Sequence, residues 1–293
     1  MTNSSFVGVA ADISRIDELL RRFNHAARSR NWLLMAMDVP PSYVFDYRAF
    51  DTLPALLVAP FVGSFLGVVI ERVDTPQSIL WGRSACPHCG TVLAPRDLVP
   101  LASWLLARGR CRHCGKPLGL FYPVIELAAL GVALWSATLT AGAAAWASDI
   151  LGWTVLALAV IDARHFLLPD FLTLPLVPLG LGANALIDPG NLESAVIGAA
   201  AGFLAIVVVR QLYWWWRGRE GIGLGDAKLL AAAGAWVGWP GLPSVVLIAA
   251  LAALAATLIR HIPRGSIPLT ERVPFGSSLC IGTWIVWLYG PLQ

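Results

Sequence analysis

Residues 151–162 read Leu-Gly-Trp-Thr-Val-Leu-Ala-Leu-Ala-Val-Ile-Asp. A long apolar run predicts a helix buried in lipid or in a helix bundle, and this run ends on an ionisable residue, Asp162. A second aspartate, Asp226, follows Gly223-Leu224-Gly225 and precedes the apolar run 229–237. A carboxylate at mid-bilayer costs roughly 2.5–3.5 kcal/mol or more, so such a residue is a functional candidate by default. The two aspartates are therefore the first candidates for a functional site.

The composition of the whole chain indicates a membrane protein. The 293 residues are 57% hydrophobic and 13% charged, with a mean hydropathy of +0.68, whereas a soluble protein carries about 25% charged residues. Apolar stretches of about 18–22 residues recur, each long enough to cross a hydrocarbon core of ~30 Å. We predict an all-α polytopic membrane protein with about eight transmembrane helices. The predicted spans are residues 53–70, 121–139, 143–161, 167–187, 194–213, 227–239, 243–260 and 276–290.

The spans divide the chain into four predicted parts: an extension over residues 1–52, a first span over 53–70, a small polar loop domain over 71–120, and the main transmembrane domain over 121–293. The extension carries an amphipathic pattern, which fits either an interfacial helix or a solvated tail helix. The first long apolar run starts only near residue 53, so no cleavable signal peptide is predicted.

Charge placement predicts the orientation. The Lys and Arg residues beyond residue 50 lie in the loops 71–120, 162–166, 214–226 and 261–275 and at the neighbouring helix ends. Positive residues stay on the cytoplasmic side, so these loops and both aspartates are expected there. The arginines of the extension do not fit this orientation. The net charge of +3 follows from topology, and nucleic-acid binding is not predicted.

The loop 71–120 contains two C-x-x-C pairs, Cys86-Pro-His-Cys89 and Cys111-Arg-His-Cys114, about 20 residues apart. Four thiolates at this spacing predict a tetrahedral zinc site, and a reducing cytoplasm disfavours disulfides. With all four positions filled by cysteine no place is left for a catalytic water, so the predicted role is structural. Substitution of His88 or His113 as a ligand is the minor alternative.

Other residues near these motifs have simpler interpretations. Gly90 and Gly115 follow the two C-x-x-C pairs, where a tight turn needs conformational freedom. Cys280 lies inside the last predicted span and is expected to be a buried, inert thiol. Taken alone, Asp226 fits a helix N-cap and Asp162 fits a residue at the membrane boundary.

A series of motifs in one order makes the interpretation specific. They are Gly63-Ser-Phe-Leu-Gly-Val-Val-Ile-Glu-Arg72, Arg83-Ser-Ala-Cys-Pro-His-Cys89, Asp97-Leu-Val-Pro-Leu-Ala-Ser-Trp104, Arg108-Gly-Arg-Cys-Arg-His-Cys114, Tyr122-Pro-Val-Ile-Glu126, Ile161-Asp162, Leu168-Pro-Asp170, Gly223-Leu-Gly-Asp-Ala-Lys228 and Pro274-Phe-Gly276. In these motifs the chain resembles the bacterial type IV prepilin peptidases, which are membrane aspartic proteases of the GxGD type. The resemblance runs from about residue 53 to 290.

The resemblance implies that Asp162 and Asp226 are the catalytic pair and that residues 121–293 form an aspartic protease domain. The implied reaction removes a short basic leader from prepilins or pseudopilins, after a glycine, at the cytoplasmic face of the inner membrane. Many members with the four-cysteine loop also methylate the new N-terminus from S-adenosylmethionine. The chain has no separate motif for that cofactor, so its binding residues stay unknown. Gly67 and Val73-Asp74 depart from the family pattern. These departures leave the implied peptidase activity untouched and count against the implied N-methyltransferase activity.

Four further residues are predicted to support the site. Gly223 and Gly225 permit a bend and a close backbone approach to Asp226. Lys228 is expected to position the helix at the interface. Glu126 enters the second span, where it is expected to pair with an arginine or another polar group.

Two rival functions follow from the same residues. In the first, the protein binds or transports, and Asp162 and Asp226 form an ion or proton relay. Such a relay distributes carboxylates along a path through the membrane, whereas the two aspartates are expected at one face. The second rival is an inactive scaffold for pilus assembly, and the intact aspartates argue against it.

Overall fold

The computed structural model describes residues 41–74, 82–218, 223–261 and 273–292. Its α-helices are α3 (Pro41–Arg72), α4 (Ala102–Leu106), α5 (Phe121–Leu139), α6 (Ala143–His165), α7 (Asp170–Ile187), α8 (Leu192–Arg217), α9 (Leu224–Val237), α10 (Leu242–His261) and α11 (Phe275–Tyr289). Short 3₁₀ turns lie at Pro95–Asp97, Pro189–Asn191 and Trp239–Gly241. Within the described residues β structure is limited to two isolated bridges, so the predicted all-α fold is confirmed.

Each predicted span coincides with a helix. Six of these helices are long and apolar enough to cross a membrane, which makes the protein a multi-pass membrane protein. The other two, α9 with 14 residues and α11 with 15, extend over only about 21–23 Å and fall short of a core of ~30 Å. The predicted spans 227–239 and 276–290 are therefore shorter helices.

Helix α3 begins at Pro41, well before the predicted start at residue 53. The chain divides into two compact units, residues 1–50 and 51–293. The amphipathic segment predicted near the N-terminus lies outside the described residues. Helix α7 runs through Pro175 and Pro178 without a break.

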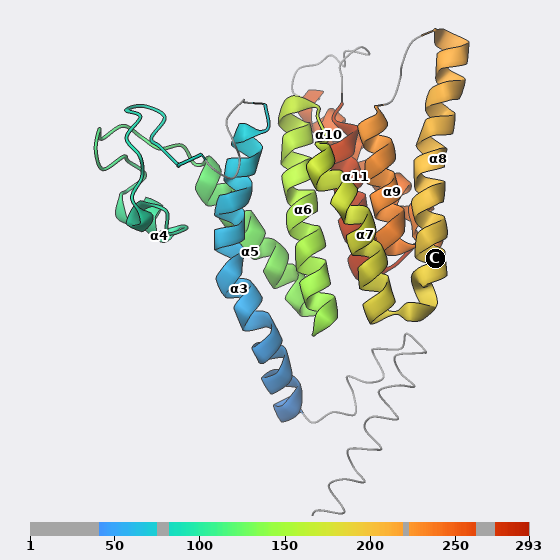
Figure 1. Ribbon diagram of the computed structural model, residues 1–293, viewed down its shortest axis with the longest axis horizontal. Coiled ribbons are helices and arrows are strands. Elements are labelled where there is room, and N and C mark those ends of the chain that lie inside the picture. The colour runs from blue at the N-terminus through green and yellow to red at the C-terminus, as the bar shows by residue number, and fades with distance from the viewer. Residues whose placement is uncertain (1–40, 75–81, 219–222, 262–272, 293) are drawn as a thin grey trace, which may run out of the picture. The chain divides into compact units, whose positions relative to one another are not determined.

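Helices α5 to α11 alternate in direction, so that each one returns the chain to the end from which the previous helix started (Figure 1). The C-terminal end of α6 therefore lies at the same end of the bundle as the N-terminal ends of α7, α9 and α11. At the other end, the turns at 140–142, 188–191 and 238–241 contain no Lys or Arg. This separation of charge is the pattern on which the predicted orientation depends.

Two hydrophobic cores meet at α6. One core packs Ile70 of α3, Ile125 of α5 and Ile161 of α6 together. The other packs Leu158 of α6 with residues of α7 to α11, among them Trp236 of α9. Since α6 belongs to both cores, it joins the first span and the polar loop to the remaining bundle.

Helix α9 lies inside the bundle and is fixed there by polar contacts from α7. Nine of its 14 residues are buried. The indole N–H of Trp236 donates to the carbonyl of Leu176 at 2.9 Å. The side-chain amide of Asn184 donates to the carbonyls of Ala235 and Trp236, each at 3.0 Å. These contacts fix the position of α9, and with it the first turn that carries Asp226.

Candidate functional site

Asp162 lies in the last turn of α6, with its side chain buried to 6% exposure. The helix ends four residues later at Phe166, which adopts a left-handed conformation (φ 52°) and donates its N–H to the carbonyl of Asp162 at 2.9 Å. A left-handed conformation is rare for a bulky non-glycine residue. The sharp end of α6 turns the chain into the 166–169 loop directly beside the carboxylate.

The Asp162 carboxylate is held by the first turn of α11. Its Oδ2 accepts a hydrogen bond from the backbone N–H of Ser277 at 2.6 Å, and the Ser277 hydroxyl lies 2.9 Å from the same oxygen. The hydroxyl is also 2.8 Å from the carbonyl of Ala159. Ser277 therefore fixes Oδ2 and leaves Oδ1 of Asp162 for other partners.

Gly276 makes this approach possible. A Cβ atom at this position would lie 3.0 Å from Asp162 Cγ and 2.9 Å from Leu168 Cδ1. Both distances are shorter than ordinary contacts between non-bonded carbons. The glycine of the Pro274-Phe-Gly276 motif thus allows α11 to pack directly on the carboxylate and on the buried Leu168.

Asp226 lies in the first turn of α9, where a carboxylate is favoured by the helix dipole. Gly223 precedes the helix in an ordinary extended conformation (φ −74°), and neither Gly223 nor Gly225 has a positive φ. The expected bend therefore uses no left-handed glycine. The expected close approach is present at Gly225, because a Cβ atom there would lie 3.1 Å from Leu168 Cβ.

The structure brings the two aspartates together. Asp162 and Asp226 are close enough to interact electrostatically, and the buried Cys280 lies near the pair. Leu168 packs against Gly225 of α9 and Gly276 of α11, so one apolar side chain sets the spacing of the helices around the pair. Two neighbouring carboxylates can share one proton, which is the requirement for an acid–base pair.

Lys228 and Asp170 form an ion pair beside the aspartates. The Lys228 ammonium donates to both oxygens of Asp170, at 2.6 and 2.8 Å. Asp170 is the first residue of α7, as its position after Pro169 predicts, and Lys228 lies on α9. The pair ties the ends of these two helices together.

The four cysteines also meet, in the described loop between α3 and α5. Their sulfur atoms all lie within 4.8 Å of one another, a spacing that fits a metal ion. Each C-x-x-C pair is closed by one antiparallel bridge, Ala85 with Val92 and Arg110 with Pro117. Gly90 and Gly115 have φ values of +69° and +70°, so the predicted need for conformational freedom is confirmed at both turns.

The surroundings of the cysteines suit a closed metal site. Cys86 and Cys111 are buried, whereas Cys89 and Cys114 are exposed. Hydrogen bonding to the Thr91 side chain and backbone lowers the pKa of Cys89 to about 6. His88 Nε2 lies 3.2 Å from the carbonyl of Pro117 and links the two turns.

Glu126 of α5 contacts the loop that carries the four cysteines. Its buried carboxylate accepts a hydrogen bond from the backbone N–H of Leu101 at 2.7 Å and one from the Ser64 side chain. The expected pairing is thus with polar groups, and Glu126 fixes the segment before α4 onto α5.

Two polar residues of the bundle were not predicted from the sequence to have a role. Ser277 follows the Pro274-Phe-Gly276 motif directly, and that position was the only signal for its role. Asp149 is a third buried carboxylate, hydrogen-bonded to Ser136. It lies on α6 about 20 Å along the helix from Asp162, towards the opposite end of the bundle.

Comparison with known proteins gives one consistent result. Residues 57–140 match the Bacterial Peptidase A24 N-terminal domain, and residues 150–258 match the Type IV leader peptidase family. The prepilin leader peptidase/N-methyltransferase of Aeromonas hydrophila is 39% identical over 263 residues, covering 80% of this chain and 89% of the relative. No solved structure matches the chain.

Two further relatives carry the same name. The protein of Burkholderia pseudomallei strain 1026b is 40% identical over 262 residues, with 80% of this chain and 84% of the relative covered. That of Pseudomonas aeruginosa is 36% identical over 274 residues, with 85% and 93% covered. Fold and comparisons together define a polytopic membrane peptidase. The chain belongs to the Type IV leader peptidase family.

Proposed function

We propose that this protein is a membrane-embedded aspartic endopeptidase that removes the short basic leader of type IV prepilins or type II secretion pseudopilins. The observation that supports it is the electrostatic proximity of Asp162 and Asp226, which α6 and α9 place at one end of the bundle. The relatives are named prepilin leader peptidases, and a leader peptidase needs its acid–base pair at a membrane face.

In the proposed peptide hydrolysis, Asp162 and Asp226 act as an acid–base pair. One ionised carboxylate takes a proton from water as the water attacks the scissile carbonyl, and the protonated partner donates to the carbonyl oxygen. Ser277 supports this by holding Oδ2 of Asp162 with its N–H at 2.6 Å. Oδ1 of Asp162 is then the atom directed at water, in a fixed orientation.

We place the aspartate end of the bundle and the cysteine loop on the cytoplasmic side of the bacterial inner membrane. Support comes from the Lys and Arg residues beyond residue 50, which lie at this end and in the cysteine loop, whereas the described turns at the opposite end contain none. In this orientation the basic leader of a substrate stays in the cytoplasm, while its apolar helix lies against the lipid-facing helices.

The finer domain and cofactor assignments belong to the same proposal. Residues 71–120 form a domain held by one Zn²⁺ on Cys86, Cys89, Cys111 and Cys114, since four clustered thiols leave no open ligand position. The transmembrane protease domain is residues 121–293. The second activity, N-methylation of the new N-terminus from S-adenosylmethionine, is supported by the names of the relatives.

The rival ion or proton relay is not favoured. A relay needs a chain of polar groups across the bundle, whereas the described bundle between Asp149 and Asp162 contains the apolar core around Leu151, Val155 and Leu158. The names of the relatives also describe peptidases.

The test is intact-mass analysis of a synthetic prepilin incubated with the purified, zinc-loaded protein. The proposal predicts loss of a leader-length mass, and a gain of one methyl mass when S-adenosylmethionine is present. Asp162→Asn and Asp226→Asn should leave the substrate uncut. Cleavage by both single variants would overturn the assignment of the pair.

A further inference from the structure

Four large apolar side chains are exposed at the end of the bundle that carries the aspartate pair. Two of them, Phe166 and Leu167, lie in the loop that joins α6 to α7 and are 51% and 42% exposed. Leu224 begins α9 and Val273 lies just before α11, and they are 46% and 42% exposed. We call these four residues the apolar rim.

The three segments that carry the apolar rim are held together by Leu168. This side chain is buried, with 8% exposure. A Cβ atom on Gly225, the neighbour of Leu224, would lie 3.1 Å from Leu168 Cβ, and one on Gly276 would lie 2.9 Å from Leu168 Cδ1. The starts of α9 and α11 therefore pack against one loop, and the rim residues approach the aspartate pair from all three segments.

Local stability does not explain a phenylalanine at position 166. Phe166 ends α6 in a left-handed conformation, with φ 52° and ψ 38°, where helices usually place glycine and sometimes asparagine. A bulky side chain is disfavoured in this conformation, and a ring that is half exposed gains little from packing. Strained residues of this kind concentrate at active sites and ligand contacts.

Ion pairs on both sides of the loop place the apolar rim at the polar surface of the bundle. On one side Arg164 pairs with Glu71 at 3.0 Å, and on the other Lys228 pairs with Asp170 at 2.6 Å. Charged groups avoid the hydrocarbon core of a membrane, so lipid chains do not account for the exposed ring of Phe166. An exposed apolar surface in a polar setting indicates a binding site for an apolar partner.

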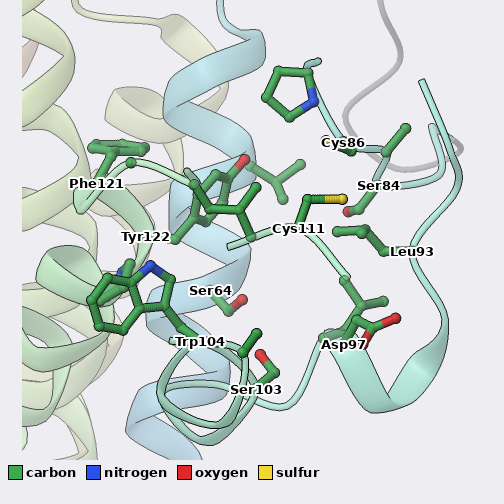
Figure 2. Close-up of a pocket in the computed structure, with 18 of the residues that line it drawn as sticks. Ser64, Ser84, Cys86, Leu93, Asp97, Ser103, Trp104, Cys111, Phe121 and Tyr122 are labelled. Carbon is green, nitrogen blue, oxygen red and sulfur yellow. The ribbon is translucent and has the colours of Figure 1, made fainter. Parts of the chain in front are cut away.

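The apolar rim is separate from the aromatic cavity beside the cysteine loop. That cavity has a volume of about 620 Å³, and the rings of Trp104, Phe121 and Tyr122 line it (Figure 2). None of the four rim residues belongs to its lining. The exposed ring of Phe166 is therefore explained by the neighbouring aspartate pair and not by this cavity.

We propose that the apolar rim binds the substrate side chain that directly follows the scissile bond, with Phe166 as the residue that selects a large apolar group there. This inference rests on the proposed peptidase function and adds a specificity site to it. In that function a basic leader ends at the cut and an apolar helix begins after it, so the apolar side chain lies after the cut.

The position of Phe166 suits this role. Its N–H donates to the carbonyl of Asp162 at 2.9 Å, so its ring is carried by the residue that closes the last turn of α6 at the carboxylate. A substrate side chain held against this ring brings the peptide bond before it to Asp162. Leu168 fixes the loop at the same point, because it is buried between α9 and α11.

The experiment measures kcat and KM for two synthetic prepilins that differ only in the residue after the cut, leucine in one and serine in the other. The full-length, zinc-loaded wild type should prefer the leucine substrate about tenfold in kcat/KM, the effect expected from burying about half of a large apolar side chain. The preference should lie in KM, because the contact is made equally in the bound substrate and in the transition state.

Phe166→Asn is the informative variant, because asparagine removes the ring and tolerates the left-handed conformation. Its melting temperature should equal or exceed that of the wild type. Its KM for the leucine substrate should rise about tenfold with kcat little changed, and its preference over the serine substrate should disappear. Phe166→Tyr, which keeps the ring, should retain the preference.

Phe171→Asn is the matched control, because Phe171 is 50% exposed and lies nearby in the first turn of α7, outside the strained loop. It should prefer the leucine substrate as strongly as the wild type does. If the ring of Phe166 only contacts lipid, both asparagine variants should keep the wild-type preference, and the proposal is overturned.

Two other results separate this proposal from the proposed peptidase function. An equal fall of kcat for both substrates in Phe166→Asn would give Phe166 a structural role at Asp162 and overturn the specificity site, although the peptidase function stands. If the wild type cleaves neither substrate nor any other prepilin, the peptidase function fails, and the specificity site fails with it.

A second measurement locates the substrate side chain directly. A prepilin with photoreactive benzoylphenylalanine after the scissile bond is bound to Asp226→Asn, which should leave it uncut, and the complex is irradiated. Proteolysis and mass spectrometry should find the label within residues 163–170. Label confined to peptides of α8 or α10 would overturn the proposal.

Discussion

The backbone N–H of Ser277 on α11 donates to the carboxylate of Asp162 on α6 at 2.6 Å, and the Ser277 hydroxyl reaches the same oxygen at 2.9 Å. Helices separated by more than 100 residues of sequence, as these are, are thus joined at a single oxygen atom. In the proposed mechanism the other oxygen of the carboxylate is the one directed at water. Ser277 is therefore expected to be a positioning residue for Asp162.

Replacing Ser277 by alanine removes the hydroxyl contact but keeps the backbone N–H. A hydrogen bond to a charged group contributes about 1.5–3 kcal/mol, so kcat for prepilin cleavage should fall about tenfold or more, with KM little changed. Ser277→Thr should restore activity, because a cavity of about 210 Å³ lined by Ser277 has room for the extra methyl group. An equal loss in both variants would contradict the role assigned to the hydroxyl.

Gly276→Ala should reduce cleavage strongly, because the added Cβ would lie 3.0 Å from Asp162 Cγ and 2.9 Å from Leu168 Cδ1 and would push the carboxylate out of place. The matched control is Gly182→Ala on α7, where a Cβ meets nothing within 4 Å. Alanine is the better helix former by about 1 kcal/mol, so the control should be as active and at least as stable as the wild type. Wild-type activity in Gly276→Ala would contradict the close packing of α11 on Asp162.

The ion pair between Lys228 and Asp170 should have a modest effect. The two side chains are 29% and 57% exposed, and exposed pairs contribute about 0.2–1 kcal/mol. Lys228→Met should therefore reduce kcat/KM only a few-fold, and combining it with Asp170→Asn should add little further loss. A loss in Lys228→Met as large as that in Asp226→Asn would mean that the ammonium takes part in the chemistry.

Zinc retention should depend on which cysteine is replaced. Cys86 and Cys111 are buried, whereas Cys89 and Cys114 are exposed, where water can replace a lost thiolate more easily. Elemental analysis should find about one zinc ion per chain in the wild type. Zinc should fall to background in Cys86→Ser and Cys111→Ser and be partly retained in Cys89→Ser and Cys114→Ser. Full zinc content in the buried variants would contradict the four-thiolate site.

Much of this arrangement follows from local patterns in the sequence. The eight apolar runs coincide with helices, and the alternation of those helices places the end of α6 beside the start of α9. The spacing of the cysteines is enough to predict their cluster, because each C-x-x-C pair folds as a unit closed by its own bridge. Periodicity and spacing act over short distances, which is why these predictions hold.

Contacts between segments that are distant in the sequence could not be predicted from local patterns. Nothing in the local sequence indicates that Ser277 donates to Asp162, or that Glu126 accepts from Leu101 and not from an arginine. The sequence also did not show that the predicted spans 227–239 and 276–290 form helices of 14 and 15 residues, too short to cross a membrane core of ~30 Å. An apolar run inside a bundle has the same composition as one that faces lipid. The cavity beside Trp104 depends on three segments packing together, and no single motif encodes it.

The central claim is that Asp162 and Asp226 act as one catalytic pair, and it is tested most directly by kcat/KM for prepilin cleavage in single and double variants. Asp162→Asn and Asp226→Asn should each reduce cleavage to background, and the double variant should lose nothing more, because groups that act as a unit are not additive. Asp149→Asn, a buried carboxylate on the same helix as Asp162, should retain cleavage. Substantial activity in either single variant, or its loss in Asp149→Asn, would contradict the account.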